Sequence, residues 1–192
     1  MRHFISGAIG FLALLGASPT LAGESAHGWV PPAGASAEKS GGEANGKGGD
    51  PAYIVLGAGA YDFHREATVS PEFSLSYRSD YKLWVFKPHA GILATGDGAV
   101  YGWGGLLVDF DLGKNWVLTP STAVGGYHQG RGKDLGSVLE FRSGLDLAYR
   151  FENRSRLGAG IYHISNAGTG RRNPGEETAI LSYSLPVSQL FK

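Results

Sequence analysis

Apolar and polar residues alternate along most of the chain after position 51. The clearest example is segment 139–151, in which one set of alternate positions is apolar and the other carries Glu140, Arg142, Asp146 and Arg150. Successive side chains of a β-strand point to opposite faces of a sheet, so this segment has one apolar and one charged face. The same period predicts seven further strands, at 52–63, 72–78, 82–93, 99–112, 115–128, 155–165 and 177–191.

The connections between these segments alternate in length. Those after the second, fourth and sixth strands are short (SDY, LGKN and ENRS), whereas the others are longer, at 65–71, 94–98, 129–136 and 166–176. Short turns at one end and longer loops at the other are typical of a bacterial outer-membrane barrel, and an even strand number puts both termini on the periplasmic side. We therefore predict an all-β fold, an eight-stranded antiparallel transmembrane β-barrel over 51–192, with its apolar face toward lipid and an ion-paired lumen.

The residues before the barrel have patterns of their own. A basic start, an apolar run over 4–17 and small residues up to Ala22 predict a secretory signal peptide at 1–22. Residues 23–50 are rich in Gly, Ala, Ser and charge and offer almost nothing to bury, so we predict a flexible, low-complexity arm. A signal peptide followed by such a barrel predicts a location in the bacterial outer membrane.

The charge and the Cys and His content of the chain argue against some classes of binding partner. The chain has 17 Lys and Arg against 17 Asp and Glu, so its formal net charge is zero. We expect no nucleic-acid partner, because neutralising phosphates requires a basic excess or a basic face. The chain has no Cys, and its His residues are scattered over different segments. We therefore predict neither a metal site nor a cofactor.

Three polar residues are predicted to meet at the extracellular rim, on the lipid-facing side. His163 and Ser165 share the parity of the apolar residues in their strand, as Glu177 does in the next. Polar groups on that face cost free energy unless they are paired or lie near the interface. Ser, His and a carboxylate are also the groups that acyl transfer needs. From the pattern alone, interfacial polar residues without a catalytic role stay an open alternative.

The stretch HISNAGTGRRNPGEE, which ends at Glu177, resembles the lipid A 3-O-deacylase (PagL) family. The resemblance in the barrel covers 52–191, but only this stretch matches as a motif: HxSNA, then NPG, then a carboxylate. Glu176 competes with Glu177 for the role of the acid, and parity favours Glu177. The resemblance implies Ser165 as nucleophile, His163 as general base, Glu177 as the orienting acid, an oxyanion hole from the Ala167 N–H and the Asn173 side chain, and Asn166 in support.

The resemblance also implies a function. The chain is then a carboxylic ester hydrolase that removes the 3-O acyl chain of lipid A, and its partner is lipopolysaccharide in the outer leaflet. A homodimer is an open alternative to a monomer. Arg171 and Arg172 either contact the phosphates of the substrate or are solvated loop charges. Two other functions stay open: a non-catalytic small barrel of adhesin or porin type, and an outer-membrane phospholipase.

Overall fold

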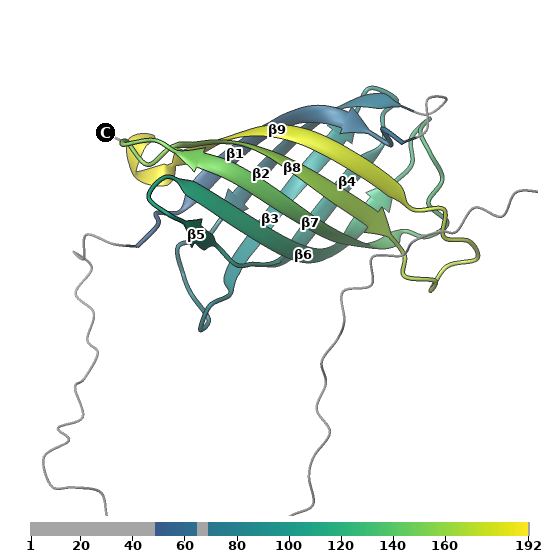
Figure 1. Cartoon of the computed structure of the whole chain (residues 1–192). Helices are drawn as coiled ribbons and strands as arrows, with labels where there is room; N and C mark the ends of the chain where they lie inside the picture. Colours follow the sequence, from purple (N-terminus) through teal and green to yellow (C-terminus); the bar gives the residue numbers. More distant parts are fainter. Residues whose placement is uncertain (1–48, 65–68, 192) are drawn as a thin grey trace, which may run out of the picture. The chain divides into compact units, whose positions relative to one another are not determined.

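The computed structural model describes residues 49–64 and 69–191. The predicted signal peptide and residues 23–48 of the predicted arm lie outside the described residues. In the described part, no helix is long and apolar enough to cross a membrane. A 3-10 helix, Val187–Gln189, follows the last strand. The strands are β1 (Tyr53–Tyr61), β2 (Ser70–Arg78), β3 (Lys87–Thr95), β4 (Val100–Leu107), β5 (Phe110–Leu112), β6 (Trp116–His128), β7 (Leu139–Arg150), β8 (Arg156–Ser165) and β9 (Glu176–Pro186), as Figure 1 shows.

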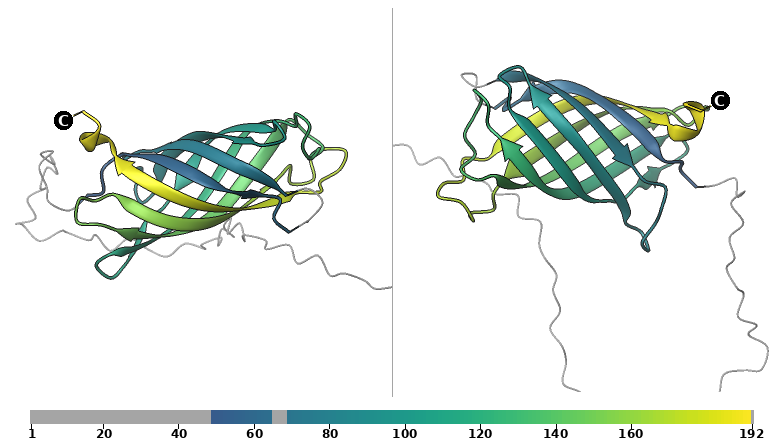
Figure 2. Two further views of the ribbon diagram at one scale, coloured as in Figure 1. Left: turned by 90° about the horizontal axis from the view of Figure 1, so that it is seen from above. Right: turned by 180° about the vertical axis from the view of Figure 1, so that it is seen from behind.

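The strands close into one antiparallel barrel (Figures 1 and 2). Consecutive strands pair except for β4 and β5, which both pair with β6, and β1 pairs with β9. β5 continues β4 along β6 in the same register, with Leu107 opposite Ser121 and Phe110 opposite Leu118. The ladder is interrupted at Pro120, which has no N–H to donate. β4 and β5 thus occupy one strand position, and the prediction of an eight-stranded barrel is confirmed.

The two faces of the sheet are sorted as the alternation predicts. Along β7, Leu145 and Leu147 are exposed on the outer wall, whereas Arg142 and Asp146 are buried in the lumen. The wall is apolar on other strands as well, and its exposed residues include Leu56, Phe73, Leu75, Ile92, Val124, Leu157, Ile161 and Leu181. An apolar exterior around a polar interior is the arrangement of a barrel that sits in hydrocarbon.

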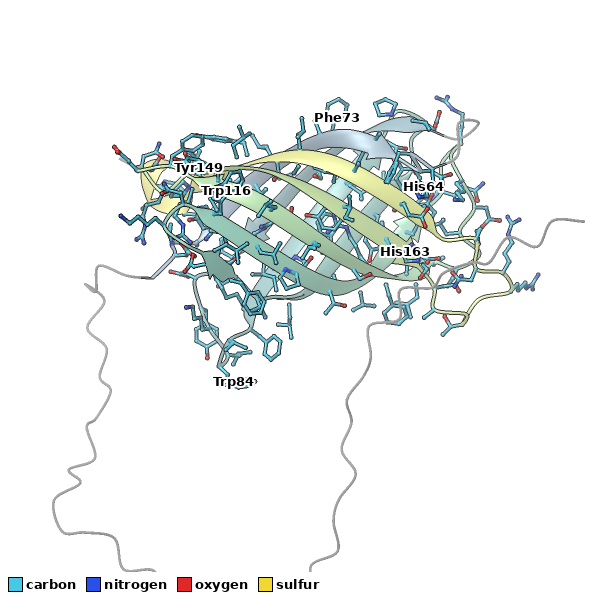
Figure 3. All side chains as sticks on the ribbon, viewed as in Figure 1. His64, Phe73, Trp84, Trp116, Tyr149 and His163 are labelled. Atoms are coloured by element: carbon cyan, nitrogen blue, oxygen red, sulfur yellow. The ribbon has the colours of Figure 1, made fainter. Side chains whose placement is uncertain are left out.

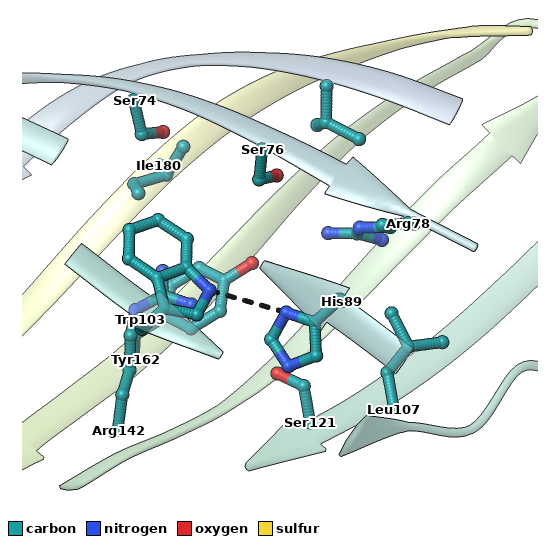
Figure 4. A pocket seen from close by; sticks show the side chains of 11 residues that line it. Ser74, Ser76, Arg78, His89, Trp103, Leu107, Ser121, Arg142, Tyr162 and Ile180 are labelled. Atoms are coloured by element: carbon teal, nitrogen blue, oxygen red, sulfur yellow. Dashed lines mark hydrogen bonds between the residues drawn. The ribbon is translucent and has the colours of Figure 1, made fainter. Parts of the chain in front are cut away.

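Ion pairs and aromatic rings fill the lumen. Arg78 Nη2 lies 3.2 Å from Asp146 Oδ2, and the Tyr162 hydroxyl donates to the same carboxylate at 2.6 Å. The Arg142 guanidinium lies 4.6 Å from the ring centroid of Trp103 and 3.4 Å from that of Tyr162. Between these side chains a cavity of about 20 Å³ leaves room for one water molecule (Figure 4). At this level the lumen is a packed core and not a channel.

A second ionic cluster lies at the terminal end of the barrel, which we define as the end where β1 starts and β9 stops. Asp109 accepts from Lys87 at 2.8 Å and from Arg156 at 3.3 Å. Arg156 Nη2 also lies 2.5 Å from Asp50, the last residue of the predicted arm. The chain that enters β1 is thereby tied to the barrel by charge.

Two strand boundaries differ from the prediction by five residues. The predicted strand at 82–93 begins only at Lys87, because Leu83 and Phe86 exchange backbone hydrogen bonds of 2.8 and 3.0 Å in a tight turn. Trp84, with φ 62°, ends the extended backbone there. The connection from β2 to β3 therefore spans residues 79–86 and is not short. The predicted strand at 177–191 stops at Pro186, where the 3-10 helix takes over.

The Arg78–Asp146 pair gives the first prediction. We expect Asp146→Ala to lower the free energy of unfolding by about 3–5 kcal/mol, because it leaves a buried guanidinium without its counter-ion. Urea titration of the folded barrel in detergent measures the change. The matched control is Asp111→Ala, which removes an exposed carboxylate that pairs with Arg150 and should cost less than about 1 kcal/mol. Equal losses in the two variants would contradict the prediction.

Candidate active site

His163 and Glu177 face each other across two paired strands. They are register partners in β8 and β9, and His163 Nδ1 lies 3.3 Å from Glu177 Oε1. The two side chains are 47% and 37% exposed on the outer wall. Figure 3 shows His163 at the end of the barrel opposite Trp116 and Tyr149, which we call the site end. A carboxylate at Nδ1 holds a proton on that nitrogen and leaves Nε2 as the basic nitrogen.

Ser165 is the last residue of β8, two residues after His163 and on the same outer face. Same-face neighbours along a strand lie about 6.6 Å apart. Among the described residues, the Ser165 hydroxyl makes no hydrogen bond to the imidazole. Ser143 is the other neighbour of His163, its register partner in β7. The structure therefore brings His163 and Glu177 into contact, and two hydroxyls flank the imidazole without bonding to it.

Glu176 points away from this pair. Its side chain is buried in the lumen, where its Oε2 lies 3.0 Å from the Thr178 hydroxyl and 3.4 Å from the backbone N of Asp62. The Thr178 hydroxyl also lies 2.9 Å from Glu72. β9 begins at Glu176, so strand alternation already applies to both carboxylates. Of the two alternatives for the acid, Glu177 is the one beside His163.

Asn166 follows β8 directly and is fully buried. Its backbone N–H donates to Asn173 Oδ1 at 3.1 Å, and its Oδ1 accepts from the backbone N–H of Gly168 at 3.0 Å. Its side-chain amide donates to the backbone oxygens of Leu135 at 2.9 Å and Arg172 at 2.8 Å. This one residue ties the β8–β9 loop to itself and to the β6–β7 loop, and so fixes the backbone next to Ser165.

The two predicted oxyanion donors lie in the same loop. Ala167 has φ 52°, a left-handed conformation that turns the chain just after β8. Asn173 Oδ1 is occupied by the Asn166 N–H, so the amide group of Asn173 presents its N–H donors. Among the described residues, neither these donors nor the Ala167 N–H has a hydrogen-bond partner. Donors without a partner in the protein are what an oxyanion hole requires.

Gly175 makes the space that the imidazole occupies. Its φ is 58°, and a Cβ at this position would lie 2.8 Å from His163 Cε1 and 3.4 Å from His163 Nε2. A side chain here would therefore push the ring, whereas glycine lets the loop backbone pass against it.

The two arginines of the loop differ in their partners. Arg172 forms an ion pair with Asp134. The backbone N–H of Gly136 and the Arg172 guanidinium lower the pKa of Asp134, so the carboxylate stays charged. Within the described ranges no carboxylate lies within ion-pair distance of Arg171, which is exposed. Arg171 is thus the arginine whose charge is available to an anion.

The sequence did not predict the positions of Ser143 and Gly175 relative to the imidazole. The outward direction of Ser143 is readable from its parity in β7, but its place opposite His163 depends on the register between β7 and β8. As for metals, the described part of the chain has no group of three or more His, Cys, Asp or Glu side chains that could hold an ion.

Comparison with known proteins identifies the family. The model of the lipid A 3-O-deacylase (PagL) family matches residues 46–186. The chain belongs to this family. It resembles the crystal structure of the outer membrane enzyme PagL, with 22% identity, a TM-score of 0.56, and coverage of 70% of this chain and 99% of that one. It also resembles a de novo designed transmembrane β-barrel, with 9% identity, a TM-score of 0.51, and coverage of 71% and 97%. No curated protein matches.

Membership in the lipid A 3-O-deacylase family makes this protein an outer-membrane enzyme and a hydrolase. The structural similarities, at these identities, support the barrel fold alone. The predicted family, the barrel and the outer-membrane location are confirmed.

Gly175 provides a test of the geometry at the imidazole. If His163 is the predicted general base, we expect Gly175→Ala to lower the rate of lipid A deacylation by about a hundredfold, because a displacement of about 1 Å at a catalytic group has that effect. Gly168→Ala is the matched control: Gly168 also has a positive φ, of 79°, but no atom lies within 4 Å of a Cβ placed there. Both variants carry the same kind of backbone strain, so a similar loss of activity in both would contradict the contact with His163.

Proposed function

We propose that the enzyme hydrolyses the ester that links an acyl chain to the 3 position of lipid A, with Ser165 as nucleophile, His163 as general base and Glu177 as the acid that orients it. The observation that carries the proposal is the 3.3 Å contact between His163 Nδ1 and Glu177 Oε1. This pair lies on a mostly apolar wall, next to Ile161 and Ala179. Polar groups in such a place cost free energy, and a function accounts for their presence.

The chemistry follows from the roles of these groups. Ser165 Oγ attacks the ester carbonyl carbon while His163 Nε2 takes the serine proton, and Glu177 stabilises the imidazolium. The Ala167 N–H and the Asn173 amide donate to the oxyanion of the tetrahedral intermediate. The sugar 3-oxygen then leaves with the proton from His163, and the acyl chain stays on Ser165. A water molecule, deprotonated by His163, releases the fatty acid and restores the serine.

The unmade hydrogen bond between Ser165 and His163 is compatible with this scheme. Contacts between nucleophile and base are often long without substrate and tighten when substrate binds. The serine side chain has to turn toward Nε2, and an acyl ester seated over the pair also excludes water from it.

The substrate reaches the site from the side. In this proposal the site end faces the outer leaflet, and the sugar headgroup of lipopolysaccharide lies over the β8–β9 loop. Its acyl chains then lie against the exposed side chains of Ile161 and Leu181 on the wall. Arg171, which has no ion-pair partner in the described part, is placed to contact a phosphate of lipid A.

Loss of the nucleophile tests the proposal directly. We expect lipid A extracted from outer membranes that contain the wild-type enzyme to have lost one 3-hydroxyacyl chain, and Ser165→Ala to restore the full mass. Ser143→Ala is the matched control, because it removes the other hydroxyl next to His163, and it should leave deacylation intact. Mass spectrometry of lipid A gives the readout.

Loss of deacylation in Ser143→Ala but not in Ser165→Ala would assign the nucleophile to Ser143. If a folded wild-type enzyme leaves lipid A unchanged but cleaves phospholipids, the proposed substrate is wrong and the enzyme is a phospholipase.

The two adjacent glutamates give a further test. We expect Glu177→Gln to lower kcat by about 10³-fold or more, because an amide no longer stabilises the imidazolium. Glu176→Gln should keep most of the activity and change the free energy of unfolding instead, since its carboxyl group is buried in the lumen. Initial rates on purified lipopolysaccharide, with urea titrations in parallel, separate the two effects. A larger loss of kcat in the Glu176 variant would contradict the assignment of Glu177 as the acid.

A further inference from the structure

The hairpin between β2 and β3 carries exposed apolar side chains at the terminal end of the barrel. In the run YKLWVF, at 81–86, every residue except Lys82 is apolar and exposed. Exposure ranges from 39% at Phe86 to 84% at Trp84. We call the five apolar residues the apolar tip: Tyr81, Leu83, Trp84, Val85 and Phe86. A tip of this composition is unusual for a turn that meets water, where Gly, Asn, Asp and Ser predominate.

The backbone holds Trp84 in an exposed position at some cost. The hydrogen bonds between Leu83 and Phe86 close the turn, and Trp84 adopts φ 62°. For a bulky side chain this left-handed conformation is strained. The rings of Trp84 and Phe86 meet edge to face, with centroids 6.1 Å apart. Water offers an exposed indole nothing that offsets this strain, so the conformation points to an apolar environment.

The apolar tip continues the lipid-facing wall. Phe73, Leu75 and Tyr77 are exposed along β2 and lead toward the hairpin. The pairing of β3 with β4 ends at Lys87 and Leu107, and β5 beyond it pairs with β6. The hairpin therefore extends past its last partner in the sheet. Figure 3 shows Trp84 at the outermost point of this hairpin, away from the barrel wall.

We propose that the apolar tip inserts into the inner leaflet of the outer membrane, where it binds the boundary between acyl chains and headgroups. Trp and Tyr prefer this boundary, and Lys82 can extend its ammonium group to lipid phosphates while its stem stays in the apolar layer. A lipid partner suits the size of the tip better than a protein does. Stable protein interfaces use roughly 20–30 residues a side, and the tip has only five.

Insertion gives the terminal end two aromatic contacts with the membrane. The rings of Trp116, Tyr149 and Phe151 form a chain of edge-to-face contacts at this end, with centroids 5.5 and 5.3 Å apart. The tip extends beyond the wall from β2 and β3. Together they resist vertical displacement and tilting of the barrel, and so hold the site end at the level of the opposite leaflet.

Site-directed spin labelling tests this proposal, because the chain has no Cys of its own. The full chain with Val85→Cys, which keeps Trp84, is labelled with a nitroxide and folded into phosphatidylethanolamine and phosphatidylglycerol vesicles. We expect the label to collide more often with oxygen, which dissolves in lipid, than with a water-soluble nickel complex. Glu152→Cys is the matched control: it lies in an exposed polar turn at the same end and should show the reverse ratio.

A label at 85 that is as accessible to nickel as the label at 152 would overturn the proposal. A label at 85 that is shielded from both reagents and broadened by a second label would assign the tip to another copy of the chain, and would overturn it too. The result does not depend on deacylation, so it stands or fails separately from the proposed mechanism.

Trp84→Gly separates strain from insertion. Glycine adopts φ 62° without strain, so a loss of stability in this variant comes from the missing indole and not from the backbone of the turn. In vesicles the same variant should unfold at lower urea concentration than the wild type, because the buried indole is gone. Equal unfolding midpoints of the two proteins in vesicles would contradict insertion of Trp84.

Discussion

Hydrocarbon offers no hydrogen-bond partner to a peptide backbone, and this constraint decides the architecture. An open sheet edge would leave N–H and C=O groups unpaired in the membrane at a cost of several kcal/mol each, so β1 closes on β9 and β4 on β6. Closure creates a narrow lumen, where buried charges need partners such as Arg78 has in Asp146. The break between β4 and β5 obeys the same constraint. It falls at Pro120, which has no N–H, and the Val108 N–H still reaches the Pro120 oxygen at 3.1 Å.

The alternation of strand faces then decides which of the two glutamates at the start of β9 lies beside His163. Glu176 and Glu177 are adjacent, yet one is buried in the lumen and the other meets His163 on the outer wall. A slip of one residue in the register of β9 would exchange them. The register of β9 is held on both sides. On one side β9 pairs with β8, and on the other the backbone N–H of Phe63 donates to the backbone oxygen of Glu177 at 3.1 Å. The ladder that closes the barrel therefore also positions the carboxylate.

Much of this fold follows from the sequence, because the face of a strand residue depends only on its parity. Parity is sufficient to sort the wall from the lumen and to separate Glu176 from Glu177. It is not sufficient at 82–86, where a run of consecutive apolar residues forms a turn with Trp84 in a left-handed conformation. It also says nothing of Ser143 opposite His163, or of the loops that Asn166 ties together. Those contacts depend on register between strands and on the path of loops, which the pattern of one strand does not contain.

The proposed site has to be both rigid and open to lipid, and different interactions meet these two needs. An exposed pair such as His163 and Glu177 is weak in water, where solvent screens it. Its orientation before substrate binds must therefore come from elsewhere, from Gly175 against the ring and from the loop that Asn166 holds. Once an acyl chain covers the pair, the local dielectric falls and the same contact becomes stronger. The geometry thus makes the imidazole most strongly coupled to its carboxylate when a lipid lies over it, which is the state in which the proposed reaction takes place.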